Sequence, residues 1–507
     1  MRHLPGSPLR FDLLLAAGLG ALHSLPFVAT WAWPLQMVVV AALAWRVASA
    51  TPGRAAWLGG VFGTAWVASG TWWLYISLHQ YGGLPAWMTV LAITLLSAAV
   101  SLYLALAMAA FARWRTERGG RDALLFGALW LLAELARGII FTGFPWIASG
   151  YAHVDAPLAA LAPWGGVYGI GCVAAVLAAW PVLGRGRALR SRAVSLAAVL
   201  LVLAAAALVG PGAFTQPSGT LNVTLLQGNV AQDEKFEAEQ MPKALAWAAE
   251  QLLAARGDLV VAPETVIPLL PSQVDPVYWQ ALTQHFQQGP QAALIGLPLG
   301  DYDVGYTNSA AGISAATAAL PDGFYRYDKH HLVPFGEFIP TGFKWFTRMM
   351  NIPLGDFNRG PVGAPSFAFR GERIGANICY EDLFGEELAA RFEDPALAPT
   401  IFANISNIGW FGDTIAVQQH LQISRLRTLE FQRPMLRATN TGATVVIDHT
   451  GRVTHALPPH TQGVLDGAVQ GRTGLTPFAW WASRSGVWPL ALLAALIVAS
   501  SALRRPR

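Results

Sequence analysis

The sequence is poor in cysteine and in charge, and each shortage excludes a class of protein. Only two cysteines, Cys172 and Cys379, occur among 507 residues, too few for the disulfide framework of a small secreted protein. Charged residues make up 13% of the chain, whereas a soluble globular protein has about 25%. The charges are missing from whole stretches, and 54% of the residues are hydrophobic. We therefore expect much of this chain to lie in a lipid bilayer.

Eight apolar runs are long enough to cross a bilayer, which needs about 20 residues per helix. One stretch, residues 11–44, is broken near Pro26 and Pro34 and predicts two spans. The other six cover residues 55–78, 84–112, 122–140, 163–183, 193–210 and 486–503. No small-residue cleavage site follows the first run, so we interpret it as a retained span rather than a signal peptide.

Arginine clusters occupy alternate loops between these runs, which also argues against nucleic-acid binding as the reason for the pI of about 9.1. The intervening loops, residues 24–33, 79–83 and 141–162, contain no Lys or Arg. Basic loops stay on the cytoplasmic side, so we expect both termini in the cytoplasm. The predicted organisation is seven spans in residues 1–212, a domain in the bacterial periplasm at 213–480, and an eighth span with a cytoplasmic tail at 481–507.

Residues 213–480 have the composition of a soluble α/β domain. Short apolar runs predict strands at 221–227, 258–262, 292–297, 307–313, 373–379, 400–403 and 444–447. Helical patterns lie between several of them, at 238–255, 276–287, 386–392 and 414–431. Strands that alternate with helices in one block favour an α/β sandwich.

Cys379 is the first candidate for a chemical role. It ends an apolar run at 373–379 and is followed at once by polar residues, as expected for a nucleophile at a strand-to-helix junction. An unpaired thiol in an oxidising compartment needs a reason to be retained. The alternative is a small buried hydrophobe, which is our interpretation of Cys172 in the sixth span.

Lysine is scarce: Lys235, Lys243, Lys329 and Lys344 are the only four among 34 basic residues. Lys329 lies among apolar and aromatic residues, where a compact ammonium with a tunable pKa serves better than a guanidinium. Glu264 ends the β-like run 258–262, at the strand edge where α/β active sites gather. A carboxylate there can take the proton of a thiol. The alternatives are a surface charge for Lys329 and a cap or ion pair for Glu264.

Three short sequence motifs resemble those of a known family. They are Val260-Val-Ala-Pro-Glu-Thr, Asp328-Lys-His-His-Leu-Val-Pro-Phe-Gly-Glu and Ile378-Cys-Tyr-Glu-Asp. They are similar to the motifs of the nitrilase superfamily of carbon–nitrogen hydrolases. With eight spans around the domain, the whole chain resembles the apolipoprotein N-acyltransferase family. The resemblance implies an α-β-β-α sandwich on the periplasmic side of the bacterial inner membrane. It also implies a triad of Glu264 as general base, Lys329 as oxyanion stabiliser and Cys379 as nucleophile.

The resemblance implies supporting roles for further residues. Glu337 would support Lys329, and Tyr380 and Glu381 would line the pocket. The family's Gln-Gly-Asn motif stands at Gln227–Asn229, which makes Asn229 a candidate. Phe236 stands where some members have Trp, so its role at the substrate entrance is less secure.

The reaction that the resemblance implies has two steps. The Cys379 thiolate takes an acyl chain from a phospholipid as a thioester, and the α-amine of a diacylglyceryl-modified lipoprotein cysteine then accepts it. No nucleotide or other cofactor is expected, and we find no Walker-type loop. Nothing in the sequence demands more than a monomer. Two rival functions remain: a membrane-tethered amidase with the same triad and water as acceptor, and a transporter or receptor with an outward sensing domain.

Three further features leave alternatives open. The loop 328–365 is rich in Pro, Gly and aromatics, and is either a surface for membrane or acyl chains or packed on the domain. Glu134 and Arg137 lie inside the fifth span, where charges are often functional, but their i, i+3 spacing favours a structural ion pair. His330 and His331 are adjacent and no cluster completes a metal site, so we expect no metal.

Overall fold

The computed structural model describes residues 8–183, 189–235, 237, 239–301, 303–340, 342 and 357–503. The chain divides into two compact units. The helical unit comprises Met1–Tyr75, Pro85–Gly212 and Val487–Arg507. The sandwich unit comprises Ile76–Leu84 and Ala213–Gly486.

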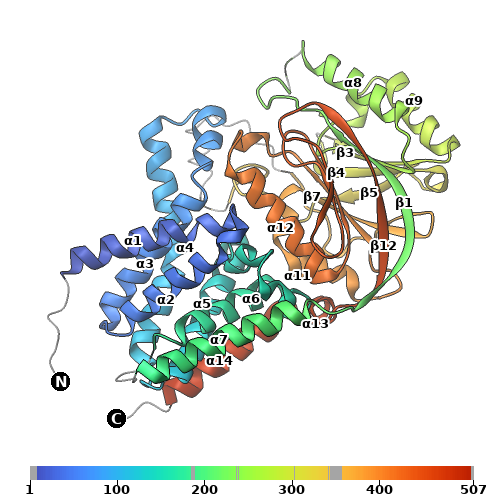
Figure 1. The fold of residues 1–507 in the computed structure, drawn as a ribbon. Helices are drawn as coiled ribbons and strands as arrows, with labels where there is room; N and C mark the ends of the chain where they lie inside the picture. Colours follow the sequence, from blue (N-terminus) through green and yellow to red (C-terminus); the bar gives the residue numbers. More distant parts are fainter. Residues whose placement is uncertain are drawn as a thin grey trace. The chain divides into compact units, whose positions relative to one another are not determined.

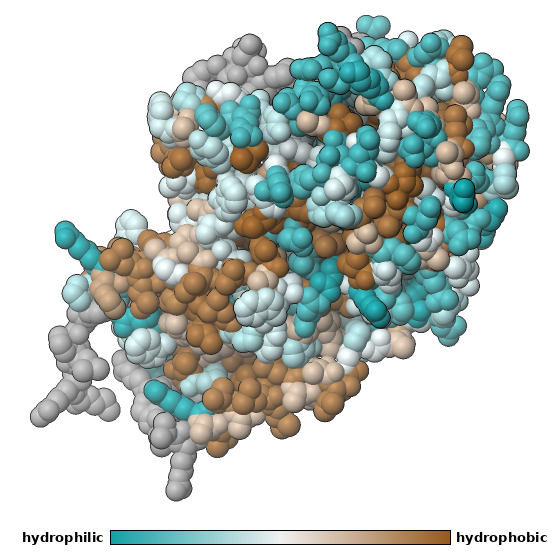
Figure 2. Space-filling view, turned by 45° about the horizontal axis from the view of Figure 1, so that its top comes forward, coloured by the Kyte–Doolittle hydropathy of each residue, from teal (hydrophilic) through white to brown (hydrophobic). Residues whose placement is uncertain are grey.

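The helical unit has a helix at each of the eight predicted runs (Figure 1). Their bounds are α1 Leu9–His23, α2 Trp33–Val47, α3 Pro52–Gly70, α4 Ala86–Trp114, α5 Gly119–Ile139, α6 Ala162–Ala179, α7 Leu189–Val209 and α14 Trp488–Leu503. Figure 2 shows broad apolar patches over these helices, whereas hydrophilic side chains are more frequent over the sandwich unit.

Not every helix meets the length expected of a span. In the described part of the chain, four helical stretches are long and apolar enough to cross a membrane: Ala86–Trp114, Gly119–Thr142, Pro157–Ala179 and Ser191–Val209. The bent pair of α13 (Pro477–Ser485) and α14 makes a fifth if it forms one span. The expectation of about 20 residues per helix is wrong for α1 and α2, which have 15 each. Between them the chain forms short 3₁₀ turns at Leu25–Phe27 and Thr30–Ala32.

A short 3₁₀ helix, η5 (Ser149–His153), is buried inside the helical unit. Its backbone is held by polar side chains, because Glu134 Oε1 accepts from Ser149 N at 2.7 Å and Gln36 Nε2 donates to Ser149 O at 3.0 Å. Arg137 lies 3.4 Å from Glu134 and 3.3 Å from the carbonyl of Ile147. The ion pair expected from the i, i+3 spacing is therefore present, and it binds backbone groups at the start of this 3₁₀ helix, where lipid would supply no partners.

The sandwich unit contains two six-stranded sheets. The first has the order β12 (Gly463–Gly474), β1 (Thr215–Gln227), β2 (Leu259–Val261), β3 (Ala292–Asp301), β4 (Gly305–Ile313) and β5 (Tyr325–Asp328). The second has the order β11 (Val453–Ala456), β10 (Val445–Ile447), β9 (Met435–Thr439), β8 (Ile401–Ser406), β7 (Glu372–Ile378) and β6 (Phe367–Phe369). In each sheet three neighbouring strands run parallel, β1-β2-β3 and β7-β8-β9.

Three hydrophobic cores define four layers. The first lies between the sheets and contains residues such as Val223, Leu225, Ile374 and Ile378. The second joins the outer face of the first sheet to α8 (Met241–Ala254) and α9 (Pro276–Gln288). The third joins the outer face of the second sheet to α11 (Gly385–Ala389), α12 (Ile415–Phe431) and α13. The observed architecture is the expected α-β-β-α sandwich, with helices on both outer faces (Figure 1).

Among the described residues, five strands and one α-helix were not predicted: β5, β6, β9, β11, β12 and α13. Strand β12 begins and ends with glycine and has two more inside it, Gly467 and Gly471, which removes the apolar alternation that marks a strand. In β9 the charged Arg437 stands in the middle of the run and is fully buried. The sequence does not show which partner makes burial of that charge possible.

Candidate active site

The candidate residues follow strands whose carboxyl ends lie at one edge of the sandwich. Glu264 comes three residues after β2, Cys379 comes directly after β7, and Asn407 comes directly after β8. Lys329 follows β5, and its backbone N–H donates to the Asn308 carbonyl of β4. Side chains from both sheets therefore meet at this edge, and the carboxyl ends of strands are the usual position of active sites in α/β folds.

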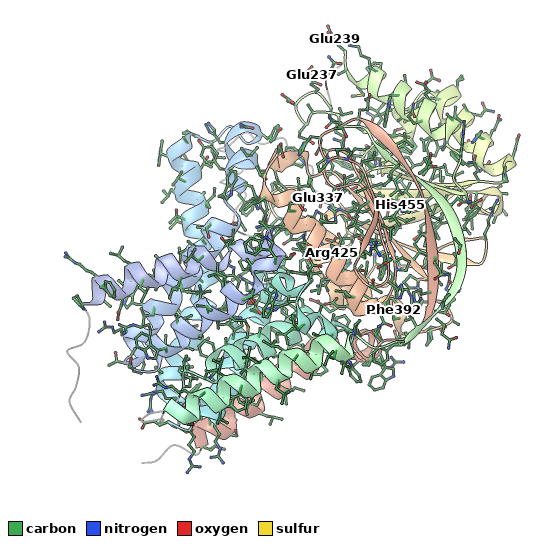
Figure 3. The ribbon with its side chains drawn as sticks, viewed as in Figure 1. Glu237, Glu239, Glu337, Phe392, Arg425 and His455 are labelled. Atoms are coloured by element: carbon green, nitrogen blue, oxygen red, sulfur yellow. The ribbon has the colours of Figure 1, made fainter. Side chains whose placement is uncertain are left out.

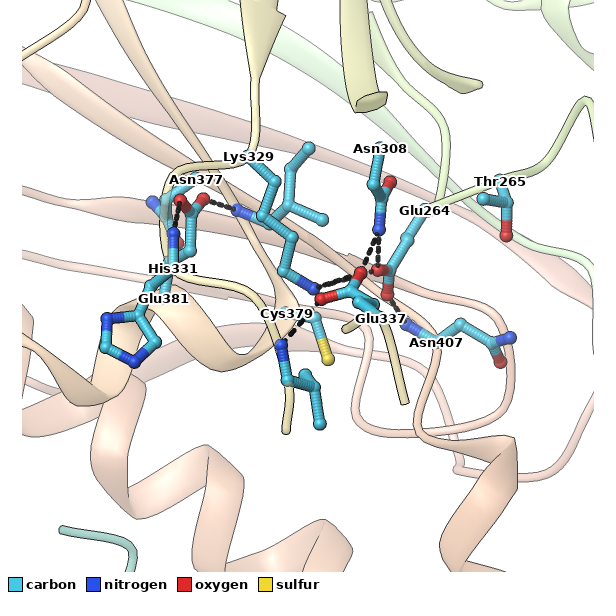
Figure 4. A network of polar contacts seen from close by, with 12 residues as sticks. Glu264, Thr265, Asn308, Lys329, His331, Glu337, Asn377, Cys379, Glu381 and Asn407 are labelled. Carbon is cyan, nitrogen blue, oxygen red and sulfur yellow. Dashed lines mark hydrogen bonds and ion pairs between the residues drawn. The ribbon is translucent and has the colours of Figure 1, made fainter. Parts of the chain in front are cut away.

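The candidate active site is centred on a buried ammonium between two carboxylates (Figure 4). Lys329 Nζ lies 2.9 Å from Glu337 Oε1 and 3.3 Å from Glu264 Oε1. The Lys329 side chain is 1% exposed, and both carboxylates are nearly buried. Figure 3 shows Glu337 inside the sandwich unit, whereas Glu237 and Glu239 lie at its periphery.

Each carboxylate is oriented by additional donors. Asn308 Nδ2 donates to Glu264 Oε1 at 2.7 Å and to Glu337 Oε1 at 2.6 Å. The second oxygen of Glu264 accepts from Asn407 N at 2.8 Å, and that of Glu337 accepts from Val333 N at 2.8 Å. The carboxylates are thus held in fixed directions before any substrate binds.

Lys329 remains an ammonium in this setting. Burial opposes its charge, but the carboxylates of Glu337 and Glu264 outweigh burial and hold the pKa of Lys329 above its ordinary value. A fixed positive charge next to a thiol can stabilise an anion that forms there.

Cys379 lies beside this cluster, at the junction that the sequence predicts (Figure 4). Strand β7 ends at Ile378, and a 3₁₀ helix, η9, covers Cys379–Leu383. The backbone of Cys379 is left-handed, with φ of 52°, which is uncommon for a residue other than glycine. Burial and the Glu264 carboxylate raise the pKa of Cys379 to about 12, with Lys329 opposing the rise. The thiol is therefore protonated at rest, and a neighbouring base has to take its proton during a reaction.

Glu381 bonds to the backbone on both sides of the site. Its Oε1 accepts from the backbone N–H groups of His330 and His331, and its Oε2 accepts from Tyr327 Oη and Ile378 N, at distances of 2.7 to 3.2 Å. Glu381 therefore joins the loop after β5 to the end of β7, and so joins Lys329 to Cys379. Tyr380 is buried and packs edge-on against Phe384, at 5.3 Å between ring centroids.

The remaining predicted residues lie further from the centre. Asn229 has a left-handed φ of 49°, and its N–H donates to Asn440 O at 2.8 Å. Asn440 Nδ2 in turn donates to Asn407 Oδ1 at 3.2 Å, so Asn229 reaches the site through two other residues. Phe236 lies outside the described residues.

The aromatic loop is described only in part. Phe343, Trp345 and Phe346 lie outside the described residues. Phe357 packs against Tyr306, with ring centroids 4.9 Å apart, and Arg359 lies over the ring of Phe338. Phe357 therefore packs on the domain, the second of the two interpretations of this loop, whereas the contact of Phe338 with Arg359 lies within the loop itself.

Lys235 is a neighbour of the site that the sequence reasoning did not select. Its Nζ donates to the carbonyl of Glu264 at 3.3 Å and to the hydroxyl of Thr265. Burial lowers the pKa of Lys235 to about 8, and the Glu264 charge opposes the change. The scarcity of lysine applied to Lys235 as much as to Lys329, so that signal was present in the sequence. Asn308 and Asn407 carried no comparable signal.

Within the part of the chain that the structure describes, no group of three or more His, Cys, Asp and Glu residues could hold a metal ion. His330 Nδ1 bonds to the carbonyl of Gly360, and His331 Nδ1 pairs with Glu387. Both histidines are thus engaged in structural contacts.

The sequence matches two family models. One is described as the apolipoprotein N-acyltransferase N-terminal domain and covers residues 19–180. The other is described as carbon-nitrogen hydrolase and covers residues 222–478. A protein of Verminephrobacter eiseniae named apolipoprotein N-acyltransferase is 53% identical, over 96% of this chain and 95% of its own length. The chain belongs to the apolipoprotein N-acyltransferase family.

Other members of that family are similar over nearly the full length. The apolipoprotein N-acyltransferase of Ralstonia nicotianae is 47% identical, over 99% of this chain and 95% of its own. Among solved structures, a carbon-nitrogen hydrolase from Helicobacter pylori G27 is 17% identical, with a TM-score of 0.36, and covers 56% of this chain and 99% of its own.

Proposed function

We propose that the protein transfers an acyl chain from a phospholipid to the α-amine of the diacylglyceryl-modified cysteine of an apolipoprotein. The observation that carries this proposal is the cluster of Glu264, Lys329 and Cys379, which lies in a chain of the apolipoprotein N-acyltransferase family. A thiol, a base and a fixed cation are the groups that acyl transfer through a thioester requires.

In the first half-reaction Glu264 takes the proton of the Cys379 thiol as its sulfur attacks the ester carbonyl of the phospholipid. Lys329 stabilises the oxyanion of the tetrahedral intermediate. The carbon–oxygen ester bond then breaks, and the lysophospholipid leaves as an alcohol that takes the proton back from Glu264. The acyl chain remains on Cys379 as a thioester.

In the second half-reaction the lipoprotein amine attacks the thioester carbonyl. Glu264 accepts a proton from the nitrogen, and Lys329 again stabilises the oxyanion. The carbon–sulfur bond breaks, an amide forms, and the thiolate of Cys379 regains its proton. An ester is exchanged for an amide, so neither a nucleotide nor a redox step is needed.

The proposal includes the eight-span topology with a periplasmic sandwich unit. It is supported by Ile76–Leu84, the loop between the third and fourth runs, which belongs to the same compact unit as Ala213–Gly486. Exposed tryptophans at helix ends also support it, because tryptophan prefers both membrane interfaces. Trp45 and Trp57 lie beside the basic loop of Arg46 and Arg54, and the opposite helix ends carry exposed Trp31, Trp72, Trp87 and Trp164.

The test is mass spectrometry of the purified protein after incubation with a phospholipid of defined acyl chains and no acceptor. The expected result is one added acyl mass on the peptide that contains Cys379. The Cys172→Ala variant is the matched control and should acquire the same mass, whereas Cys379→Ala should acquire none.

Addition of a diacylglyceryl-cysteine peptide should then discharge the thioester and give an N-acyl peptide. Release of free fatty acid without transfer to the amine would instead support an amidase-like enzyme that uses water. Full activity in Cys379→Ala would refute the proposal, because the covalent intermediate could not form.

A further inference from the structure

A second polar cluster, which the reaction steps above do not use, lies behind the nucleophile. Asp382 comes from η9, His420 and Ser424 come from α12, and Arg437 comes from β9. All four side chains are fully buried. Burial of two charges and an imidazole is costly unless they are paired with each other, so a role for this cluster has to explain that cost.

The cluster reaches the backbone of Cys379. His420 Nε2 lies 2.9 Å from Asp382 Oδ1 and 3.3 Å from the carbonyl oxygen of Cys379. Asn404, from β8, donates to the same carbonyl through Nδ2 at 3.1 Å. Two side chains from different elements therefore hold one carbonyl group, that of the nucleophile itself.

The hydrogen bonds decide the protonation of His420. Arg437 Nη2 lies 2.7 Å from His420 Nδ1, and a guanidinium can only donate, so Nδ1 accepts and Nε2 carries the hydrogen. Burial lowers the pKa of His420, and the positive charge of Arg437 lowers it further. His420 is thus a neutral donor towards Asp382 and Cys379, and not an acid or base.

Arg437 and Asp382 hold the imidazole in this orientation. Arg437 Nη1 lies 3.4 Å from Asp382 Oδ2, and the Ser424 hydroxyl also contacts both residues. The imidazole consequently has Arg437 on Nδ1, and both Asp382 and the Cys379 carbonyl on Nε2. It cannot turn without breaking these contacts.

The backbone of Cys379 needs such support. Its left-handed φ of 52° is sterically unfavourable for a residue with a β-carbon, and it sets the direction of the thiol. We propose that Asp382, His420 and Arg437 are positioning residues that hold Cys379 in this conformation, with its thiol directed at the Glu264–Lys329 cluster. The inference rests on the proposed role of Cys379 as nucleophile.

The test compares His420→Leu with His420→Gln in the full-length protein, with thioester formation from a defined phospholipid as the readout. Leucine removes the donor, and we expect the rate constant of acylation to fall about a hundredfold, with the KM for phospholipid unchanged. Glutamine supplies a donor for the Cys379 carbonyl and an acceptor for Arg437, so it should restore most of the rate.

The control for general destabilisation is Arg427→Met. Arg427 forms a buried ion pair with Glu430 in the same helix, and the Arg427 side chain is as buried as that of His420. Its variant should lose stability and keep the acylation rate of the folded protein. An equal loss of rate in Arg427→Met, or an equal loss in His420→Leu and His420→Gln, would overturn the inference.

If His420→Leu does not accumulate as folded protein, Asn404→Leu removes the other donor to the same carbonyl. It should also slow acylation at unchanged KM, and a wild-type rate in that variant would contradict the inference. Cys379→Ala in the same assay separates the two proposals. A thioester formed by Cys379→Ala would refute the role of Cys379 as nucleophile. If Cys379→Ala forms no thioester but His420→Leu is acylated at the wild-type rate, only the positioning role is refuted.

Discussion

Lys329 Nζ lies 2.9 Å from Oε1 of Glu337, closer than it lies to Glu264. Both Oε1 atoms also accept from Asn308, so the two carboxylates differ in their distance to the ammonium, and Glu337 carries more of its charge balance. A carboxylate that is less tightly bound to the cation is better able to accept a proton. This division of labour between two carboxylates leads to the first prediction.

Glu337→Gln should lower both acylation rate and stability. Without Glu337, Lys329 pairs more closely with Glu264, which makes Glu264 a poorer base, so we expect the rate of thioester formation to fall about a hundredfold. Breaking a buried ion pair costs about 3–5 kcal/mol, which thermal unfolding in detergent would detect. Glu387→Gln is the control, because Glu387 pairs with His331 and has no contact with Lys329 among the described residues. A normal rate in Glu337→Gln would contradict this division of roles.

Glu264→Gln should separate the reactivity of the thiol from catalysis. The pKa of Cys379 is raised to about 12 by burial and by the Glu264 charge, so removal of that charge should lower the pKa. At a given pH below 12 more thiolate is then present, and alkylation of Cys379 by iodoacetamide should become faster.

Thioester formation by the same Glu264→Gln variant should fall by about 10²–10⁴-fold, because the group that moves the proton is lost. Both measurements are made in a Cys172→Ala background, so that Cys379 is the only thiol. Slower alkylation in Glu264→Gln would show that the carboxylate is not what keeps the thiol protonated.

Lys235→Met should lower the rate of thioester formation about tenfold, because a charge-assisted hydrogen bond to the Glu264 backbone is lost. The pKa of Lys235 is lowered to about 8 by burial, so its ammonium loses a proton as the pH rises through 8. The wild-type rate should therefore decline above pH 8, and the methionine variant should lack this decline. Lys243→Met is the matched control, since Lys243 is exposed and donates to Gln240 on the same stretch of chain. Identical pH profiles in Lys235→Met and the wild type would exclude a role for Lys235.

Glu134→Gln and Arg137→Met should each destabilise the helical unit. Each change leaves the other charged residue buried without its ion-pair partner and weakens the contacts that hold the segment Ser149–His153. The expected loss is about 3–5 kcal/mol for either change, and the double variant should lose less than the sum. Thermal unfolding in detergent measures it, with Glu117→Gln as control. Glu117 pairs with Arg115 near the surface, where about 0–1 kcal/mol is expected. Unchanged stability but lost acyl transfer would assign the pair a functional role.

The parts of the fold that could be predicted are those encoded by the local pattern of residues along the sequence. Long apolar runs and the alternation of arginine clusters located eight helices, because membrane insertion depends on composition over about 20 residues. Strands β2 and β3 were found because their apolar residues are consecutive. Strands β9 and β12 were missed, because the pairing that stabilises a buried Arg437 or a glycine-rich strand comes from residues distant in sequence.

The sequence by itself determined that apolar helices accompany an α/β domain in this chain, and it picked out Cys379, Lys329 and Glu264 by residue type, scarcity and position at run ends. Only the tertiary structure decided which other groups meet them. Glu264 is contacted by residues from separate strands and loops, Asn308, Asn407 and Lys235. The carbonyl of Cys379 is contacted by His420, which is itself held by Asp382 and Arg437. The physical reason is that a hydrogen bond depends on a distance of about 3 Å, which two sheets packed face to face create between residues far apart in sequence.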